Sequence, residues 1–222
     1  YGYYGESIIH HIEYLMNSGG GDSQKLEMMW EMARRVVNEA LKRGGHSGGL
    51  LQSASRVAIQ IKEYERAVEL LEELLAHHDR IAMTNLPKSD DGSRVEAFNQ
   101  LGLVQQNLKN DDKAELAFRT GLQFFPTSCA LLNNLACLYR DQQRLQEAYD
   151  VITQCSNPPD NQAPATYNNL ALIESDGGHY EAAIGHFNLA LRSIPGGENN
   201  PHFGSHILNN LEEATRKLQE QA

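Results

Sequence analysis

Histidines are the residues of this chain with the plainest capacity for chemistry, since imidazole binds metals and moves protons. His10-His11 and His77-His78 are adjacent pairs, and His179 lies 186 - 179 = 7 residues before His186. Adjacent residues of a helix point about 100° apart, so neither adjacent pair converges on one ion. The third pair has no adjacent cysteine or carboxylate cluster. We interpret all six as surface or packing residues and expect no metal site.

Cysteines and glycines give no catalytic pattern either. Cys129, Cys137 and Cys155 form no Cys-x-x-Cys pair, and their odd number predicts free thiols in a reducing, intracellular compartment. We interpret Cys137 as a small packing residue rather than a reactive thiol. The glycine run at 19–21 is followed by no Lys-Ser/Thr, so it is a turn and not a phosphate loop. The sequence therefore predicts a protein that is not an enzyme and needs no cofactor.

Composition excludes two classes of partner. The 222 residues are 41% hydrophobic and 22% charged, with a formal net charge of -10. No apolar run approaches the roughly 18 residues of a membrane helix, and no basic stripe offers contacts to a phosphate backbone. We expect no membrane span and no nucleic-acid partner. The chain begins with Tyr1 rather than Met, which we interpret as a fragment or a processed chain.

Amide side chains form the one polar pattern that repeats. Asn133-Asn134-Leu135-Ala136 recurs as Asn168-Asn169-Leu170-Ala171, and the Asn-Asn-Leu core returns at 209–211. An amide offers both a donor and an acceptor, which match the backbone of an extended peptide. The same side chains could instead bond within or between helical hairpins. Both readings of the amide column stay open at this point.

The spacing of these motifs indicates the elements that carry them. Leu101 to Leu135 is 135 - 101 = 34 residues, and Leu135 to Leu170 is 170 - 135 = 35. One residue set follows the pattern W-x2-L-G-x2-Y…A-x3-F…P, with Phe in place of Trp and Gln105 in place of Tyr: Phe98, Leu101, Gly102, Ala114, Phe118 and Pro126. The sequence here resembles the tetratricopeptide repeat family.

The resemblance implies an all-α, right-handed solenoid of four to five helical hairpins with a C-terminal capping helix. Small residues at Gly102, Ala136 and Ala171 would let the second helix of each hairpin cross the first closely. The predicted divisions are a degenerate N-terminal hairpin at 1–47 with helices at Glu6–Met16 and after Asp22 or Ser23, a degenerate repeat at 48–81, a loop at 82–94, repeats at 95–128, 129–163 and 164–197, and a capping helix at 198–222.

In this family the first helix of every hairpin lines the concave surface, which gives the candidate peptide-binding positions. They are Asn99, Gln100, Asn133, Asn134, Asn168 and Asn169, with Arg56, Gln106, Asn107 and Arg140 further along the same helices. The two arginines would prefer an acidic group on the ligand. Three or four hydrogen bonds contribute only about 2–5 kcal/mol, whereas micromolar binding needs about 8 kcal/mol. Side-chain pockets must supply the difference.

The Asn-Asn-Leu-Ala segments are similar to the repeats of O-GlcNAc transferase and of kinesin light chain, which bind extended peptides along the concave groove. The last spacing, 211 - 170 = 41 residues, is similar to the lengthened kinesin light chain repeat. The carboxylate clamp of chaperone-binding tetratricopeptide domains is disfavoured, because Asn99, Leu103, Ala165 and Asn169 occupy places where the clamp needs Lys, Asn and Arg.

We therefore predict an interaction scaffold that binds an extended peptide of a partner protein on its amide-lined concave surface. Two alternatives remain: a permanent structural subunit of a multiprotein assembly, joined through its convex surface and loops such as Met83–Ser93, and the targeting arm of a longer enzyme.

Overall fold

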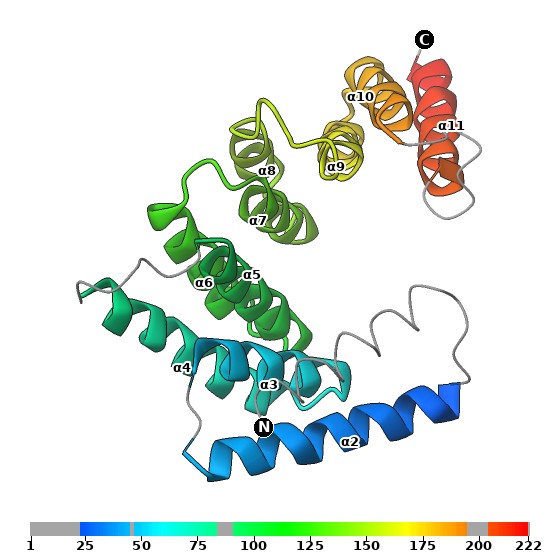
Figure 1. Ribbon diagram of the computed structural model, residues 1–222. Helices are drawn as coiled ribbons and strands as arrows, with labels where there is room; N and C mark the ends of the chain where they lie inside the picture. Colours follow the sequence, from blue (N-terminus) through cyan, green and yellow to red (C-terminus); the bar gives the residue numbers. More distant parts are fainter. Residues whose placement is uncertain (1–22, 45–46, 84–90, 195–203, 222) are drawn as a thin grey trace. The chain divides into compact units, whose positions relative to one another are not determined.

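The computed structural model describes residues 23–44, 47–83, 91–194 and 204–221, and these residues form ten helices and no strand (Figure 1). The helices are α2 (Ser23–Lys42), α3 (Gly48–Gln60), α4 (Tyr64–Ala82), α5 (Asp91–Asn107), α6 (Asp111–Phe124), α7 (Cys129–Asp141), α8 (Leu145–Ile152), α9 (Ala163–Asp176), α10 (Tyr180–Arg192) and α11 (Gly204–Gln221). The predicted all-α class is confirmed.

The chain divides into two compact units, residues 1–117 and 118–222, with the division inside α6. In the first unit α2 packs on α3, α3 on α4 and α4 on α5. Its core includes Trp30, Leu51 and Leu74. In the second unit α7 packs on α8. There too α9 packs on α10 and α10 on α11, around a core that includes Phe187 and Ile207.

Four hairpin turns share one backbone conformation. In each turn a single residue adopts a positive φ: Lys62 (63°), Lys109 (61°), Gln143 (60°) and Gly178 (79°). The next N–H donates to a carbonyl five residues earlier, as in Glu63 to Ala58 at 2.8 Å, Asn110 to Gln105 at 2.9 Å, Arg144 to Tyr139 at 2.9 Å and His179 to Glu174 at 2.8 Å. These bonds satisfy carbonyls that a helix end would otherwise leave open, which is the Schellman motif.

Small residues lie where the helices approach most closely. The alanine early in each second helix has no exposed surface, at Ala67, Ala114, Ala148 and Ala183. Gly102, Ala136 and Ala171 of the first helices are buried as well. A larger side chain at such a position forces neighbouring side chains off their preferred rotamers, at a cost of roughly 1–3 kcal/mol. The predicted crossing residues therefore occupy the core.

The first half of the chain was predicted to have two N-terminal helices and a loop at 82–94. The predicted helix Glu6–Met16 lies outside the described residues, whereas the helix after Asp22 is α2 and begins at Ser23. The loop predicted at 82–94 is too long, because α4 includes Ala82 and α5 already begins at Asp91. The acidic Asp91 suits a first helical turn, where exposed N–H groups favour negative charge. The repeat boundaries as such stay predictions.

Candidate functional site

The amide pairs predicted from the sequence lie on the first helices of the hairpins. Asn133 and Asn134 belong to α7, Asn168 and Asn169 to α9, and Asn209 and Asn210 to α11. Each pair directly precedes the repeat leucine, and in α7 and α9 it lies within about one helical turn of the buried Ala136 or Ala171 that follows. The same helical register therefore presents the pairs in all three helices.

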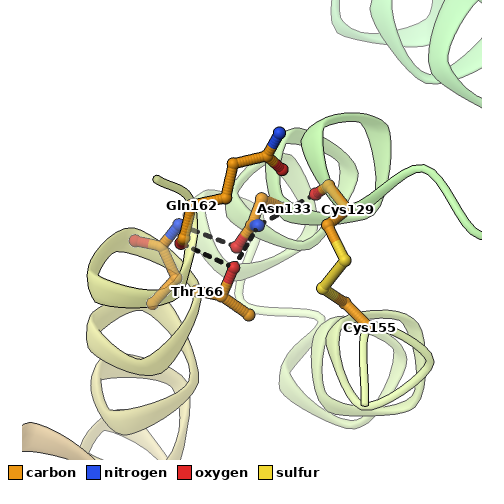
Figure 2. The surroundings of a disulfide bond; sticks show 6 residues. Cys129, Asn133, Cys155, Gln162 and Thr166 are labelled. Atoms are coloured by element: carbon orange, nitrogen blue, oxygen red, sulfur yellow. Dashed lines mark hydrogen bonds between the residues drawn. A yellow bond between two sulfur atoms is a disulfide. The ribbon is translucent and has the colours of Figure 1, made fainter. Parts of the chain in front are cut away.

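Asn133 lies inside a hydrogen-bonded network between α7 and α9, and only 7% of it is exposed (Figure 2). Its Nδ2 donates to the carbonyl oxygen of Cys129 at 2.8 Å and to Oγ1 of Thr166 at 2.7 Å. The Thr166 hydroxyl in turn donates to the carbonyl of Gln162 at 3.0 Å. Both amide hydrogens of Asn133 are thus used within the chain, which is the second reading left open by the sequence.

The outer amides are hydrogen-bonded between helices in a repeating order. Asn169 donates from Nδ2 to Oδ1 of Asn133 at 3.3 Å, and Asn210 donates from Nδ2 to Oδ1 of Asn168 at 3.5 Å. In both cases the second Asn of one pair donates to the first Asn of the preceding pair. We call Asn133, Asn168, Asn169 and Asn210 the amide row. The row holds successive first helices in register.

Part of the amide row remains accessible. Asn168, Asn169 and Asn210 are half-buried. Within the described residues, Nδ2 of Asn168 and Oδ1 of Asn169 have no hydrogen-bond partner. One donor and one acceptor are therefore left on adjacent side chains, and separate peptide groups of an extended chain can satisfy them.

The other predicted binding residues differ in their hydrogen bonds within the chain and in their burial. Arg140 bonds across to Asp176 on α9 at 2.6 Å, Gln100 donates to Glu96 at 2.6 Å, and Asn107 donates to the Leu103 carbonyl at 2.9 Å. Asn134, Asn99 and Gln106 are half-buried, and Arg56 is exposed. Of the predicted set, Asn169 is hydrogen-bonded to Asn133, and Asn168 is hydrogen-bonded to Asn210 on α11.

Comparison with known proteins agrees with this repeating geometry. A family model described as a tetratricopeptide repeat matches residues 131–162, which contain most of α7 and all of α8. Residues 131–162 therefore form a tetratricopeptide repeat. A comparison with curated protein sequences finds no match. The likeness of the Asn-Asn-Leu-Ala segments to O-GlcNAc transferase and kinesin light chain stays a prediction.

Solved tetratricopeptide repeat structures share the fold at low sequence identity. BtubC (BKLC) from P. vanneervenii has a TM-score of 0.69 and 18% identity, covering 87% of this chain and 84% of that chain. TTC0263, a thermophilic protein of Thermus thermophilus, has 0.63 and 15%, covering 94% and 99%. YrrB, described as having an unusual peptide-binding site, has 0.55 and 15%, covering 91% and 90%. Such identities show the fold alone.

One repeat carries a covalent link that the sequence reasoning missed. Cys129 at the start of α7 is disulfide-bonded to Cys155 just after α8 (Figure 2). The prediction of three free thiols is wrong, because the antiparallel hairpin brings together residues 26 apart in the sequence. The signal was available: both cysteines lie within the same predicted repeat, 129–163. The expected reducing compartment loses the argument on which it rested and stays only a prediction.

Cys137 is the remaining thiol, and it is poorly suited to nucleophilic chemistry. Burial, together with the nearby Asp141 carboxylate, raises the pKa of this thiol from 9.0 to about 11, although Arg140 lowers it somewhat. The thiol is thus protonated near neutral pH, and the thiolate is the reactive form. This supports the interpretation of Cys137 as a packing residue.

A second feature missed from the sequence is a buried carboxylate that contacts His186. The carboxylate of Glu174 on α9 lies 2.7 Å from Nδ1 of His186 on α10, whose ring also stacks on Tyr167. The sequence held a signal for this contact: the acidic Glu174 occupies the position that Gln105 and Tyr139 occupy in the two preceding helical hairpins. Across the described ranges no group of three or more His, Cys, Asp or Glu side chains could hold a metal ion.

Membrane spans require helices that are both long and apolar. Among the helices that the structure describes, none combines the length and apolar character required to cross a membrane.

Proposed function

We propose that this tetratricopeptide repeat chain binds an extended segment of a partner protein along the amide row. The fold is typically a non-catalytic scaffold for protein interactions, and YrrB is a peptide-binding member of it. The observation that carries the proposal is the open donor of Asn168 beside the open acceptor of Asn169. Together they can satisfy the C=O and N–H of a ligand backbone whatever its side chains are.

The network behind the row gives the proposal its mechanism. Asn133 uses its oxygen to hold the Nδ2 group of Asn169, and Thr166 holds Asn133 in turn. An amide whose rotamer is fixed before binding loses less conformational entropy when a ligand arrives. In this proposal the buried Asn133 therefore orients the ligand-binding Asn169 and does not contact the ligand itself.

The test compares two variants of the full chain in affinity capture followed by titration with the captured partner segment. Asn168→Ala combined with Asn169→Ala removes the open groups and should weaken binding by roughly tenfold, since each hydrogen bond contributes about 0.5–1.5 kcal/mol. Thr166→Val disturbs the supporting network from a buried position and leaves the open groups in place, so it should weaken binding less than the double variant does. Binding by the double variant equal to that of the unchanged chain would refute the proposal and favour a permanent structural subunit. An equal loss in Thr166→Val would assign the effect to the network alone.

A further inference from the structure

A cavity of about 370 Å³ lies between α8 and the α9–α10 hairpin, apart from the amide row. Leu145, Ile173 and Ala182 form apolar parts of its wall, and Tyr149, Glu174 and His179 line it as well. Glu174 follows Asn169 by 174 - 169 = 5 residues, which puts it on a different side of α9. The cavity is therefore independent of the proposed peptide contact.

Glu174 is the unusual residue in this wall, because only 5% of it is exposed although it carries a carboxylate. Its Oε2 accepts a hydrogen bond from His186, whose ring is held by Tyr167. The other oxygen, Oε1, has no partner within the described residues. A buried carboxylate requires several donors to offset the loss of water. The position is thus only partly satisfied by the chain itself.

The preceding repeat shows what satisfies the same position there. Tyr139 occupies the equivalent site, 174 - 139 = 35 residues earlier, and the chain supplies it with guanidinium groups. Arg144 lies over the Tyr139 ring, with its guanidinium carbon 4.0 Å from the ring centroid, and Arg119 donates to the Tyr139 hydroxyl at 3.5 Å. The residue equivalent to Arg144 is His179, 179 - 144 = 35. In the last repeat, therefore, His179 stands where the preceding repeat has Arg144. Glu174, a carboxylate, stands where the preceding repeat has Tyr139.

We propose that this cavity binds the guanidinium group of an arginine side chain from a partner protein. A guanidinium can donate two N–H bonds to a carboxylate and stack on an aromatic ring, and Glu174 and Tyr149 provide these two partners. Charge-assisted bonds of this kind are among the strongest available in a partly desolvated site. The cavity-lining residues, all within the described part of the chain, include no Lys or Arg that would compete.

Charge on the rest of the chain favours the same ligand. The formal net charge of -10 attracts cationic segments at long range. The apolar wall of Leu145, Ile173 and Ala182 suits the methylene stem that precedes a guanidinium. An acidic ligand would place a second negative charge beside the Glu174 carboxylate, and a neutral polar ligand would donate only an uncharged, weaker hydrogen bond. A basic side chain is therefore the occupant that this wall selects.

The test is an NMR titration of the full chain with N-acetyl-arginine amide, read at the backbone amides of Tyr149 and Gly177. N-acetyl-citrulline amide, which has nearly the same shape without the charge, is the comparison probe. We expect millimolar binding of the arginine probe, at least about tenfold tighter than citrulline, since hydrogen bonds to charged groups contribute about 1.5–3 kcal/mol. Equal shifts with both probes, or shifts with neither, would overturn the proposal.

Variants locate the site on Glu174. Glu174→Gln should weaken arginine binding by roughly tenfold or more. Glu181→Gln is the matched control, because it removes the same charge from an exposed position of α10. Tyr149→Leu changes a residue that is 41% exposed, so it tests the site even if Glu174→Gln fails to fold. Retained binding in Tyr149→Leu and in a folded Glu174→Gln would overturn the proposal.

Discussion

At the scale of single residues, the hairpin turns depend on a backbone conformation that most amino acids avoid. Gln143 and Lys109 adopt φ near 60°, where the last hairpin turn has Gly178. A Cβ atom in this left-handed region costs roughly 1–2 kcal/mol, and glycine avoids the cost because it has no Cβ. Three of the four turns, those at Lys62, Lys109 and Gln143, thus carry strain that the turn at Gly178 does not.

Replacing Gln143 by Gly should raise the free energy of unfolding by about 0.5–1 kcal/mol, because relief of the Cβ clash exceeds the added entropy of the unfolded chain. Urea denaturation followed by circular dichroism measures the change. Gln146→Gly, three positions later and inside α8, should instead lower the free energy by about 1 kcal/mol. A loss of similar size in both variants would show that Gln143 is not strained.

Single residues also show where sequence reasoning succeeds and where it stops. Ala136 and Ala171 were predicted to be buried from the repeat register alone, and both are. Asn133 has the same register as Asn168, yet its amide is enclosed because Thr166 lies opposite it. The repeat register predicts the face of the helix on which a side chain lies. It does not predict which residue lies opposite, because that residue belongs to another repeat. The Glu174–His186 pair escaped prediction for the same reason.

At the scale of elements, the α7–α8 hairpin differs from the others because a disulfide joins the two chain ends that lie opposite its turn. The Cys129–Cys155 bond joins the first residue of α7 to a residue just after α8. Together with the turn at Gln143, it ties both ends of the helix pair. Hydrogen bonds from Asn133 then connect this closed hairpin to α9.

Reduction of this disulfide should lower the free energy of unfolding by about 2–4 kcal/mol, because the open chain regains the entropy of a loop with a sequence separation of 26. Urea denaturation with and without reductant measures the loss. A Cys137→Ser variant should respond in the same way, whereas Cys129→Ala with Cys155→Ala should not respond. Alkylation of all three cysteines in the unreduced folded chain would refute the pairing.

Element positions were more predictable than element boundaries. The 34- and 35-residue spacings predicted each helix pair from Leu101 onward, because a repeated hydrophobic pattern averages over local exceptions. The start of α5 at Asp91 was missed, since Asp, Gly and Ser at 90–93 also favour turns. Helix packing overrides such local preferences once the apolar face that follows is buried.

For the whole molecule, repeat proteins require a helix that covers the last apolar face. In the second compact unit α11 has this role, because it packs on α10 and contributes Ile207 and Ala214 to the core around Phe187. Its opposite side carries Glu212, Glu213 and Arg216, which are exposed. The predicted capping helix is thus present at Gly204–Gln221.

Ile207→Ala should lower the free energy of unfolding by about 2–5 kcal/mol, because Ile207 is only 1% exposed and its removal leaves a cavity under the cap. Hydrogen exchange should accelerate in α9, α10 and α11. Leu189→Ala on the surface of α10 is the control and should change the free energy by about 0.5 kcal/mol or less. Comparable losses in both variants would argue that α11 does not cap the unit.

The closed α7–α8 hairpin has one more consequence, which concerns proteolysis. All peptide bonds between Cys129 and Cys155 lie inside a covalent ring. A protease that cuts the exposed turn at Gln143 would therefore open the ring without releasing a fragment. The nicked chain would migrate as a single species on a denaturing gel until a reductant separated its two halves.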